Sequence, residues 1–183
     1  MKSVSDSVVI AASAEEIYAC ISDPTQFGRW SEEATGATLI GEAGRGAYVG
    51  MQFEGHNRWN PKFRGRLRLL PTWTTRCLVT VAEPPHVFAF RAWLPILGDR
   101  SQPRLKLTLA TWEYRLDSAD GGTRVTESWS WSISEWLARS TRFLAPLTAG
   151  VNSVEEFQAR NIASTLSRLK QDLESPRGAS PTS

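Results

Sequence analysis

The sequence predicts an α+β fold in which a curved antiparallel β-sheet wraps around one long C-terminal helix, with two short helices after the first strand. Three observations support this prediction. The β-branched run Val4–Ile10 is followed at once by two helix starts. Residues 153–174 repeat apolar side chains at helical spacing. Strand-like alternation fills the region between them and carries most of the eight tryptophans, so a cavity between sheet and helix would have aromatic walls.

Length and composition indicate one globular domain. The 183 residues are 41% hydrophobic and 22% charged, which is ordinary for a globular protein. We expect a single domain over residues 1–175, followed by a polar, disordered tail over residues 176–183. No apolar run approaches the ~18 residues of a membrane span, and Met1–Asp6 lacks the apolar core of a signal peptide. These features predict a cytoplasmic protein.

Cysteine and histidine usage argues against a metal centre. Cys20 falls in a helical pattern and Cys77 in a strand pattern, which predicts two buried free thiols and fits a reducing compartment. The only histidines, His56 and His86, lie in expected loops. Metal sites and nucleophile–base sets need several such groups together, so we expect no metal and no cofactor.

Two helix starts follow the first strand. Ser13 and Glu16 form a capping box, which predicts a helix from about Ala14 to Ser22. Asp23-Pro24 repeats the logic, with aspartate as N-cap and proline at the first helical position. This second start predicts a short helix that ends near Trp30. Two helices in tandem at this point would close one end of a sheet.

Alternating apolar residues predict a series of strands between the helices. The expected strands are Leu39–Ile40, Val49–Glu54, Thr74–Val81, Val87–Leu94, Leu105–Leu116 and Thr123–Ser132. Asp120-Gly121-Gly122 is a strong hairpin signal between the last two. Short connections of this kind favour an antiparallel meander.

The segment Ser153–Glu174 predicts one amphipathic helix. Ser153 and Glu156 form a second capping box. Opposite charges at helical spacing, Glu156–Arg160 and Arg168–Asp172, would pair along the helix. The stripe expected to face the sheet consists of Val154, Phe157, Asn161, Ile162, Thr165, Leu166, Leu169 and Leu173.

Positive charge is concentrated in one stretch, although the net charge is only +2. Between Gly55 and Gly98 the only acid is Glu83. The stretch contains Arg58, Lys62, Arg64, Arg66, Arg68, Arg76 and Arg91, interleaved with Trp59, Phe63 and Trp73. The preferred interpretation is an edge hairpin with a solvated arginine face, in which Arg76 and Arg91 are solvated, and no nucleic-acid partner is expected. The alternative is a surface that contacts an anionic membrane peripherally, or RNA, through Arg58–Arg76.

A set of short motifs occurs in order along the chain. They are Val8-x-Ile10-x-Ala12-Ser13-x-Glu15-x-Ile17-Tyr18, Ile21-Ser22-Asp23-Pro24, Phe27-x-x-Trp30-Ser31, Phe53-x-Gly55-x-Asn57, Cys77-x-Val79, Glu83-Pro84-Pro85, Phe88-Ala89-Phe90, Trp112-x-Tyr114-x-Leu116 and Gly122-Thr123-x-Val125-Thr126-Glu127. Together they resemble the SRPBCC superfamily, which contains START, pollen-allergen-like and polyketide cyclase/dehydrase proteins. The resemblance covers about Val4 to Glu174, and the order of elements matches the helix-grip arrangement of that superfamily.

The resemblance implies a deep cavity between sheet and helix that holds a hydrophobic or aromatic small molecule, lipid- or polyketide-like. It leaves two functions open: a binding protein, or a cyclase, aromatase or dehydratase that uses the same cavity. Two segments, Gly55–Trp73 and Ser134–Gly150, depart from the compact bacterial pattern. We expect both to lie at the mouth of the cavity and control access to it.

Aromatic residues on the last two strands are the main candidates for a cavity wall. Trp112 and Tyr114 share one face of a strand, and Trp129 and Trp131 share one face of the next. Four large aromatics are hard to pack without voids, so a ligand-lined wall is one interpretation and plain core is the other. The full set expected at the ligand is Trp30, Phe53, Asn57, Phe88, Phe90, Trp112, Tyr114, Glu127, Trp129, Trp131, Phe157 and Asn161.

Four polar residues of that set could contact the ligand directly. Glu127 shares a face with the tryptophans, so its carboxyl would be paired with an arginine, turned outward by a bulge, or raised in pKa. In an enzyme, Glu127 and Tyr114 would be the acid/base residues. Asn57, after an expected turn at Gly55, would bond a ligand carbonyl or cap that turn. Asn161 interrupts the apolar stripe of the last helix and would face the cavity.

Overall fold

The computed structural model describes residues 3–41, 46–58, 72–98, 103–131 and 154–175. Its elements are β1 (Ser3–Ile10), α1 (Ala14–Ile21), the 3-10 turn η1 (Pro24–Gln26), α2 (Phe27–Trp30), β2 (Ala34–Ile40), β3 (Gln52–Arg58), β4 (Thr72–Glu83), β5 (Val87–Gly98), β6 (Pro103–Ala119), β7 (Gly122–Trp131) and α4 (Val154–Glu174). The expected order of a strand, short helices, further strands and a long last helix is confirmed.

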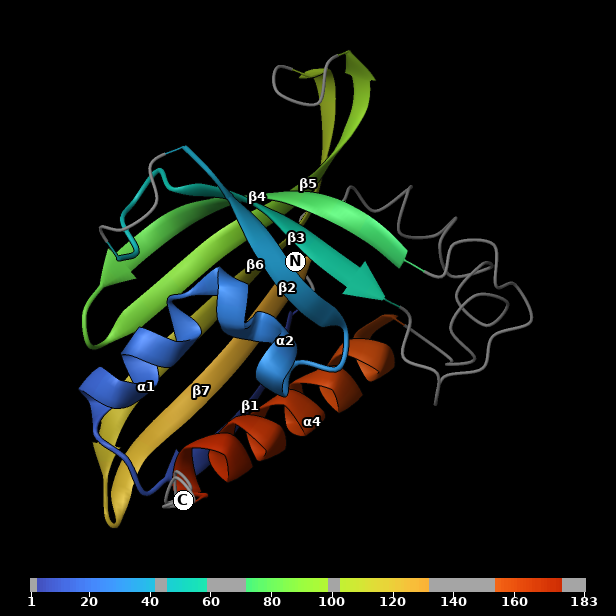
Figure 1. Ribbon diagram of the computed structural model, residues 1–183. Helices are drawn as coiled ribbons and strands as arrows, with labels where there is room; N and C mark the ends of the chain where they lie inside the picture. The colour runs from blue at the N-terminus through green and yellow to red at the C-terminus, as the bar shows by residue number, and fades with distance from the viewer. Residues whose placement is uncertain (1–2, 42–45, 59–71, 99–102, 132–153, 176–183) are drawn as a thin grey trace, which may run out of the picture.

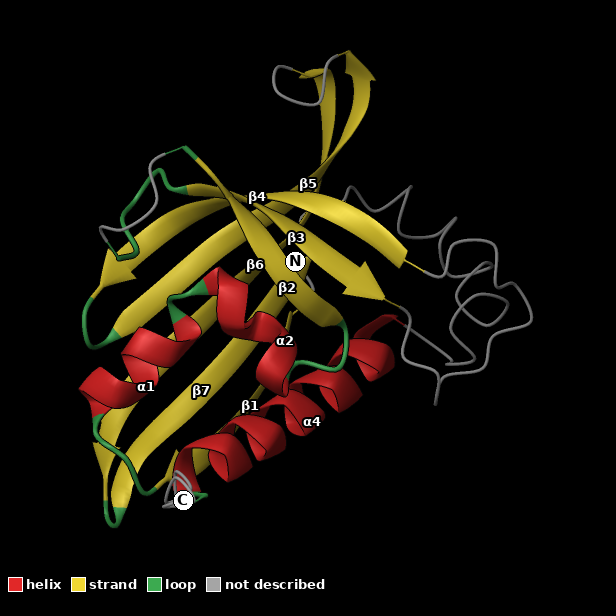
Figure 2. Ribbon diagram, viewed as in Figure 1, coloured by secondary structure: helices red, strands yellow, loops and turns green. Residues whose placement is uncertain are grey.

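The strands form one antiparallel sheet in the order β1-β7-β6-β5-β4-β3-β2. Each strand from β2 to β7 pairs with its neighbour in the sequence, and β1 returns to pair with β7. β1 and β2 are the two edges, and the curved sheet stays open. Figures 1 and 2 show α1, α2 and α4 on the same face of the sheet. The predicted α+β helix-grip architecture is therefore confirmed.

The helix caps form as the sequence predicts. Ser13 Oγ accepts the Glu16 N–H at 3.2 Å, and Glu16 Oε2 accepts the Ser13 N–H at 3.3 Å, which completes the capping box. Asp23 accepts a backbone N–H at 3.0 Å and caps η1. Since the first cap directs the chain from β1 into α1 and the second starts η1, the caps fix where the helical segment crosses the sheet.

α2 lies directly against β2. A Cβ at Gly28 would stand only 2.4 Å from the Thr35 carbonyl oxygen, so only glycine permits this approach. The contact directs the end of α2 toward the centre of the sheet. There, the buried Trp30 ring meets Tyr114 edge-on at 6.2 Å between ring centroids.

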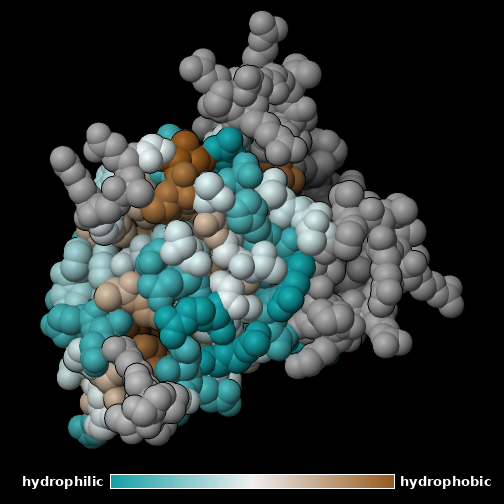
Figure 3. Space-filling model, viewed as in Figure 1, coloured by the Kyte–Doolittle hydropathy of each residue, from teal (hydrophilic) through white to brown (hydrophobic). Residues whose placement is uncertain are grey.

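α4 covers the β1–β7 side of the sheet. Lys170 Nζ donates to the Val9 carbonyl at 2.6 Å, and the Ala11 N–H donates to Glu174 Oε1 at 2.8 Å, so the end of the helix is fixed to β1. The face of the molecule in Figure 3 is mostly hydrophilic over α4, as expected for an amphipathic helix. The side chains it buries are Phe157, Gln158, Asn161, Ile162, Thr165, Leu166 and Leu169.

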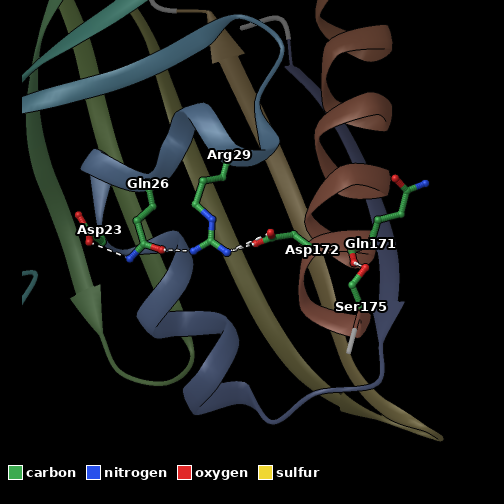
Figure 4. A network of polar contacts seen from close by, with 6 residues as sticks. All are labelled: Asp23, Gln26, Arg29, Gln171, Asp172 and Ser175. Carbon is green, nitrogen blue, oxygen red and sulfur yellow. Dashed lines mark hydrogen bonds and ion pairs between the residues drawn. The ribbon is translucent and has the colours of Figure 1, made fainter. Parts of the chain in front are cut away.

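One of the two ion pairs expected within α4 is replaced by a contact with another helix. Glu156–Arg160 is present. Asp172 instead binds Arg29 of α2, with 2.9 Å between Oδ2 and the guanidinium. Figure 4 shows that Arg29 also donates to Gln26, which continues the polar chain to the N-cap of η1. Helical spacing could suggest Arg168 as partner of Asp172, but it could not reveal an arginine from a distant segment.

The segment from β2 to β3 differs from the sequence expectation in three places. β2 spans Ala34–Ile40, which is longer than the expected Leu39–Ile40. β3 excludes Val49, whose side chain is 64% exposed. The expected turn at Gly55 is wrong, because β3 continues through it. Gly55 is needed for packing instead: a Cβ there would lie 3.1 Å from Thr75 Oγ1 of β4.

The edge-hairpin interpretation of the basic stretch is wrong for its described part, because β3 and β4 each have a neighbour on both sides. Arg91 is exposed, as expected. Arg76 is not solvated but half-buried, and it pairs with Glu54 at 3.5 Å. Residues 59–71, with most of the basic side chains, lie outside the described residues, so membrane contact through Arg58–Arg76 stays a prediction.

Cys20 and Cys77 are free and buried, as expected. The expected tail over residues 176–183 and the capping residue Ser153 lie outside the described residues. So does most of each segment expected to control access to a cavity. That expectation also stays a prediction.

Candidate ligand-binding site

One wall of the candidate site is formed by β6 and β7. Trp112 lies opposite Trp129 in the ladder and Tyr114 lies opposite Glu127, so these four side chains point to one face of the sheet. Trp131 continues that face, and its ring meets the Trp129 ring edge-on at 5.4 Å between centroids. The contacts of α4 with β1 and β7 place the helix over this face. The prediction from strand alternation, that these residues share one face of the sheet, is therefore confirmed.

Glu127 is the one charged residue that is buried among the described residues, and it is 2% exposed. Its Oε1 accepts the Tyr114 O–H at 2.9 Å. Its Oε2 has no hydrogen-bond partner in the described part of the chain. Burial raises the pKa of Glu127 to about 8, against the opposing effect of the Tyr114 bond and with a smaller contribution from the negative charge of Glu33. At neutral pH the carboxyl therefore mostly holds a proton.

A second carboxyl faces the first from the segment after α2. Glu33 Oε2 accepts the Asn161 Nδ2–H of α4 at 2.8 Å. Burial raises the pKa of Glu33 to about 7, although the Asn161 bond lowers it. Glu33 reaches this position because Trp30, three residues earlier, is fixed against Tyr114. Asn161, expected at the ligand, thus connects α4 to the polar centre of the site.

Several buried polar atoms at the α4–β7 boundary lack hydrogen-bond partners among the described residues. Polar atoms buried in a protein are nearly always satisfied, so such a group is unusual. Asn161 and Gln158 lie three positions apart on α4 and are 4% and 8% exposed. The atoms are Glu127 Oε2, Asn161 Oδ1, Gln158 Oε1 and Trp131 Nε1.

Three phenylalanines expected at the ligand, Phe53, Phe88 and Phe90, form a cluster of rings on β3 and β5. Phe53 and Phe90 lie 5.3 Å apart between ring centroids, and Phe88 and Phe90 lie 5.9 Å apart. Phe27 of α2 contacts both Phe53 and Phe90. These rings pack against one another, and their role in ligand binding stays a prediction.

The remaining expected residues occupy different positions. Phe157 is buried on α4, one position before Gln158. Asn57 lies in β3, half-buried, and its Nδ2 donates to the Gly55 carbonyl and to Thr75 Oγ1, both at 3.3 Å. Since no turn exists at Gly55, the turn-capping interpretation of Asn57 is wrong.

Sequence reasoning missed two residues of this site. Gln158 could have been found, because it lies one helical turn before Ile162 in the stripe of α4. Glu33 carries no comparable signal. It follows a four-residue helix, and its partner Asn161 comes 128 positions later in the chain.

No group of three or more histidine, cysteine, aspartate or glutamate side chains is placed to hold a metal ion in the described ranges. None of the helices in the part of the chain that the structure describes is both long and apolar enough to cross a membrane.

Comparison with known proteins identifies the family. A family model described as polyketide cyclase/dehydrase and lipid transport matches residues 1–174. The chain belongs to this family. The SRPBCC resemblance found in the motifs is therefore confirmed. A search of curated protein sequences finds no match.

Solved structures agree on the fold. The chain is similar to the di-domain aromatase/cyclase BexL from the BE-7585A biosynthetic pathway, with a TM-score of 0.61 and 16% identity, covering 96% of this chain and 50% of BexL. It is also similar to protein Ms6760 from Mycobacterium smegmatis, with a TM-score of 0.59 and 16% identity over 93% of this chain and 90% of the other. Protein NE0264 from Nitrosomonas europaea gives a TM-score of 0.58 at 12% identity over 93% of both chains. At these identities the likeness supports the fold alone.

Proposed function

We propose that the protein binds a hydrophobic or aromatic small molecule between α4 and the β6–β7 wall. The family and fold are consistent with ligand binding in a cavity. One observation carries the proposal: buried polar atoms without partners gather beside an aromatic wall. A ligand whose apolar body contacts the tryptophans and whose polar group meets Glu127 and Asn161 would satisfy both.

Plain core is the competing account of the same residues. A solid core would not leave Glu127 Oε2 and Asn161 Oδ1 unbonded, because each unsatisfied buried group costs about 1–3 kcal/mol. Buried polar atoms without hydrogen-bond partners need an explanation in a native structure, and contact with a ligand is one such explanation. The arrangement therefore favours a site over a core.

Isothermal titration calorimetry with 2-(2-naphthyl)ethanol tests the proposal. The wild-type chain should bind it saturably, one molecule per chain. Trp129→Ala should weaken binding by about tenfold or more, because a stacked aromatic surface is lost. Tyr48→Ala is the matched control, since Tyr48 is a 43% exposed aromatic side chain in the loop before β3. Absence of saturable binding by any hydrophobic probe would refute the proposal.

An acid/base enzyme is the second candidate, and one observation favours it. The Glu127 carboxyl is bonded to Tyr114 and has one free oxygen. Its pKa of about 8 suits proton transfer near neutral pH. Steady turnover of a poly-β-ketone mimic that is lost in Glu127→Gln, while binding is retained, would support the enzyme. Saturable binding without turnover would support the binding protein.

A further inference from the structure

Three carboxyl groups converge on one side of the proposed site. Glu127 is buried in β7, and Glu33 approaches it from the segment after α2. Asp6 of β1 lies directly opposite Glu127 in the ladder and is exposed. The three carboxyl groups therefore extend from the buried interior of the site to the protein surface.

No buried basic side chain in the described part of the chain lies among these carboxyl groups. The buried polar residues described there include no lysine, arginine or histidine. Three basic residues of α2 and α4 have other partners: Arg160 pairs with Glu156, Lys170 with Glu174, and Arg29 with Asp172. Ionised carboxylates without a cation nearby are costly to bury, so the two glutamates hold protons in the free protein. A cation from outside would allow them to ionise.

The buried atoms that lack hydrogen-bond partners also favour a cationic ligand. Asn161 Oδ1 and Gln158 Oε1 are hydrogen-bond acceptors, and a deprotonated Glu127 Oε2 is a third. Trp131 Nε1 is the only donor of this group. A ligand that supplies several N–H donors would satisfy more of these atoms than one that supplies acceptors.

The wall beside the carboxyls also suits a cation. Trp129 is buried next to Glu127 on β7, and its ring contacts that of Trp131. Indole faces attract ammonium groups through their quadrupole, and tryptophan is the strongest of the aromatic side chains in this respect. Acidic and aromatic groups on one face are therefore a combination that recognises organic cations.

We propose that the ligand is an arylalkylamine, in which an alkyl chain joins aromatic rings to an amine. Its protonated nitrogen lies between Glu127, Glu33 and Asn161 while its rings contact Trp129 and Trp131. The inference rests on the proposed binding function and names its ligand class. A carboxylate ligand such as a fatty acid would instead place a negative charge beside the two glutamates and oppose their ionisation.

Amine binding should release protons from the site. The folded protein holds protons on Glu127 and Glu33, whose pKa values are about 8 and about 7, and a bound cation favours their ionised forms. Tyr114 and Asp6 also face Glu127 and remain on either side of it. Affinity for the amine should therefore rise between pH 6 and pH 8. An alkylammonium, like lysine with its pKa of about 10.4, stays charged throughout this range.

Three probes with the same naphthyl body separate the possible outcomes. Calorimetry on the full chain would compare 2-(2-naphthyl)ethylammonium, 2-(2-naphthyl)ethanol and 2-naphthylacetate. The ammonium should bind at least about tenfold more tightly than the alcohol at pH 8, and the acetate should bind weakest. An alcohol or acetate that binds as tightly as the ammonium would overturn the amine inference and leave the binding function intact. Binding by none of the three would overturn both.

Charge-neutralising variants locate the effect. Glu127→Gln, and separately Glu33→Gln, should weaken ammonium binding about tenfold or more and reduce its pH dependence, and should weaken alcohol binding by a smaller factor. Glu113→Gln is the matched control, because Glu113 lies next to Tyr114 on β6 but is exposed and pairs with Arg115. If Glu113→Gln weakens the ammonium as much as the other two, the effect is one of overall charge, and the inference fails.

Discussion

Replacing Glu127 by glutamine should change how stability depends on pH. The folded carboxyl keeps its proton up to about pH 8, whereas the unfolded carboxyl ionises near its ordinary value of 4.5. Between these values the folded state holds an extra proton. The free energy of unfolding must therefore fall as pH rises, by about 1.4 kcal/mol per pH unit while the group is fully linked.

The magnitude follows from the same two values. From pH 5 to pH 8 the Glu127 contribution should cost the wild type about 3 kcal/mol of stability. Glutamine has the same shape, can still accept the Tyr114 O–H and does not titrate. The difference in unfolding free energy between Glu127→Gln and the wild type should thus shift by about 3 kcal/mol in favour of the variant between pH 5 and pH 8. That is a large effect for one isosteric change.

Urea denaturation at half-unit pH steps would measure this difference. Other titrating groups are shared by both proteins, so the difference between the two curves reports position 127 together with its effect on Glu33. Glu113→Gln, on the outer face of β6, should give a curve parallel to the wild type. Parallel curves for Glu127→Gln and the wild type would refute the claim that Glu127 is buried and protonated.

Three further predictions concern single contacts. Trp129→Ala should weaken naphthyl binding measured by calorimetry more than it lowers stability measured in urea; a loss of about 3–5 kcal/mol in stability with unchanged binding would make Trp129 ordinary core. Gly28→Ala should lower the melting temperature markedly, because its Cβ would meet the Thr35 carbonyl at 2.4 Å, and an unchanged melting temperature would contradict the close packing of α2 on β2. Arg29–Asp172 should contribute no more than about 1 kcal/mol in a double-mutant cycle, since Arg29 is 55% exposed; a coupling of several kcal/mol would show that the pair is far less screened.

The parts of the fold that the sequence predicts well are those with local signals. The capping box at Ser13, the N-cap at Asp23 and the hairpin at Asp120-Gly121-Gly122 each depend on neighbouring residues, and all three are present. Gly55 shows the limit of such signals. Glycine serves both turns and close packing, and only the approach of Thr75 decides between them.

In the candidate site, too, residues with a local pattern were predicted and residues placed by long-range contacts were not. Strand alternation placed Tyr114, Glu127 and Trp129 on one face because each lies in a regular strand. Glu33 could not be found, because its position depends on a short helix whose Trp30 contacts Tyr114 of β6 and on an asparagine far along the chain. The contact between Asp172 and Arg29 was missed for the same reason. Contacts between distant segments leave no periodic pattern in a sequence.

The central claim is that the space between α4 and the β6–β7 wall holds a ligand. The most direct test is the indole N–H spectrum of ¹⁵N-labelled protein, with the Trp131 signal assigned by Trp131→Phe, during titration with 2-(2-naphthyl)ethylammonium. Trp131 Nε1 is buried and has no described partner. Its signal should shift progressively and saturate at one probe per chain. Saturable binding that leaves the Trp131 signal in place would put the ligand elsewhere and contradict the account.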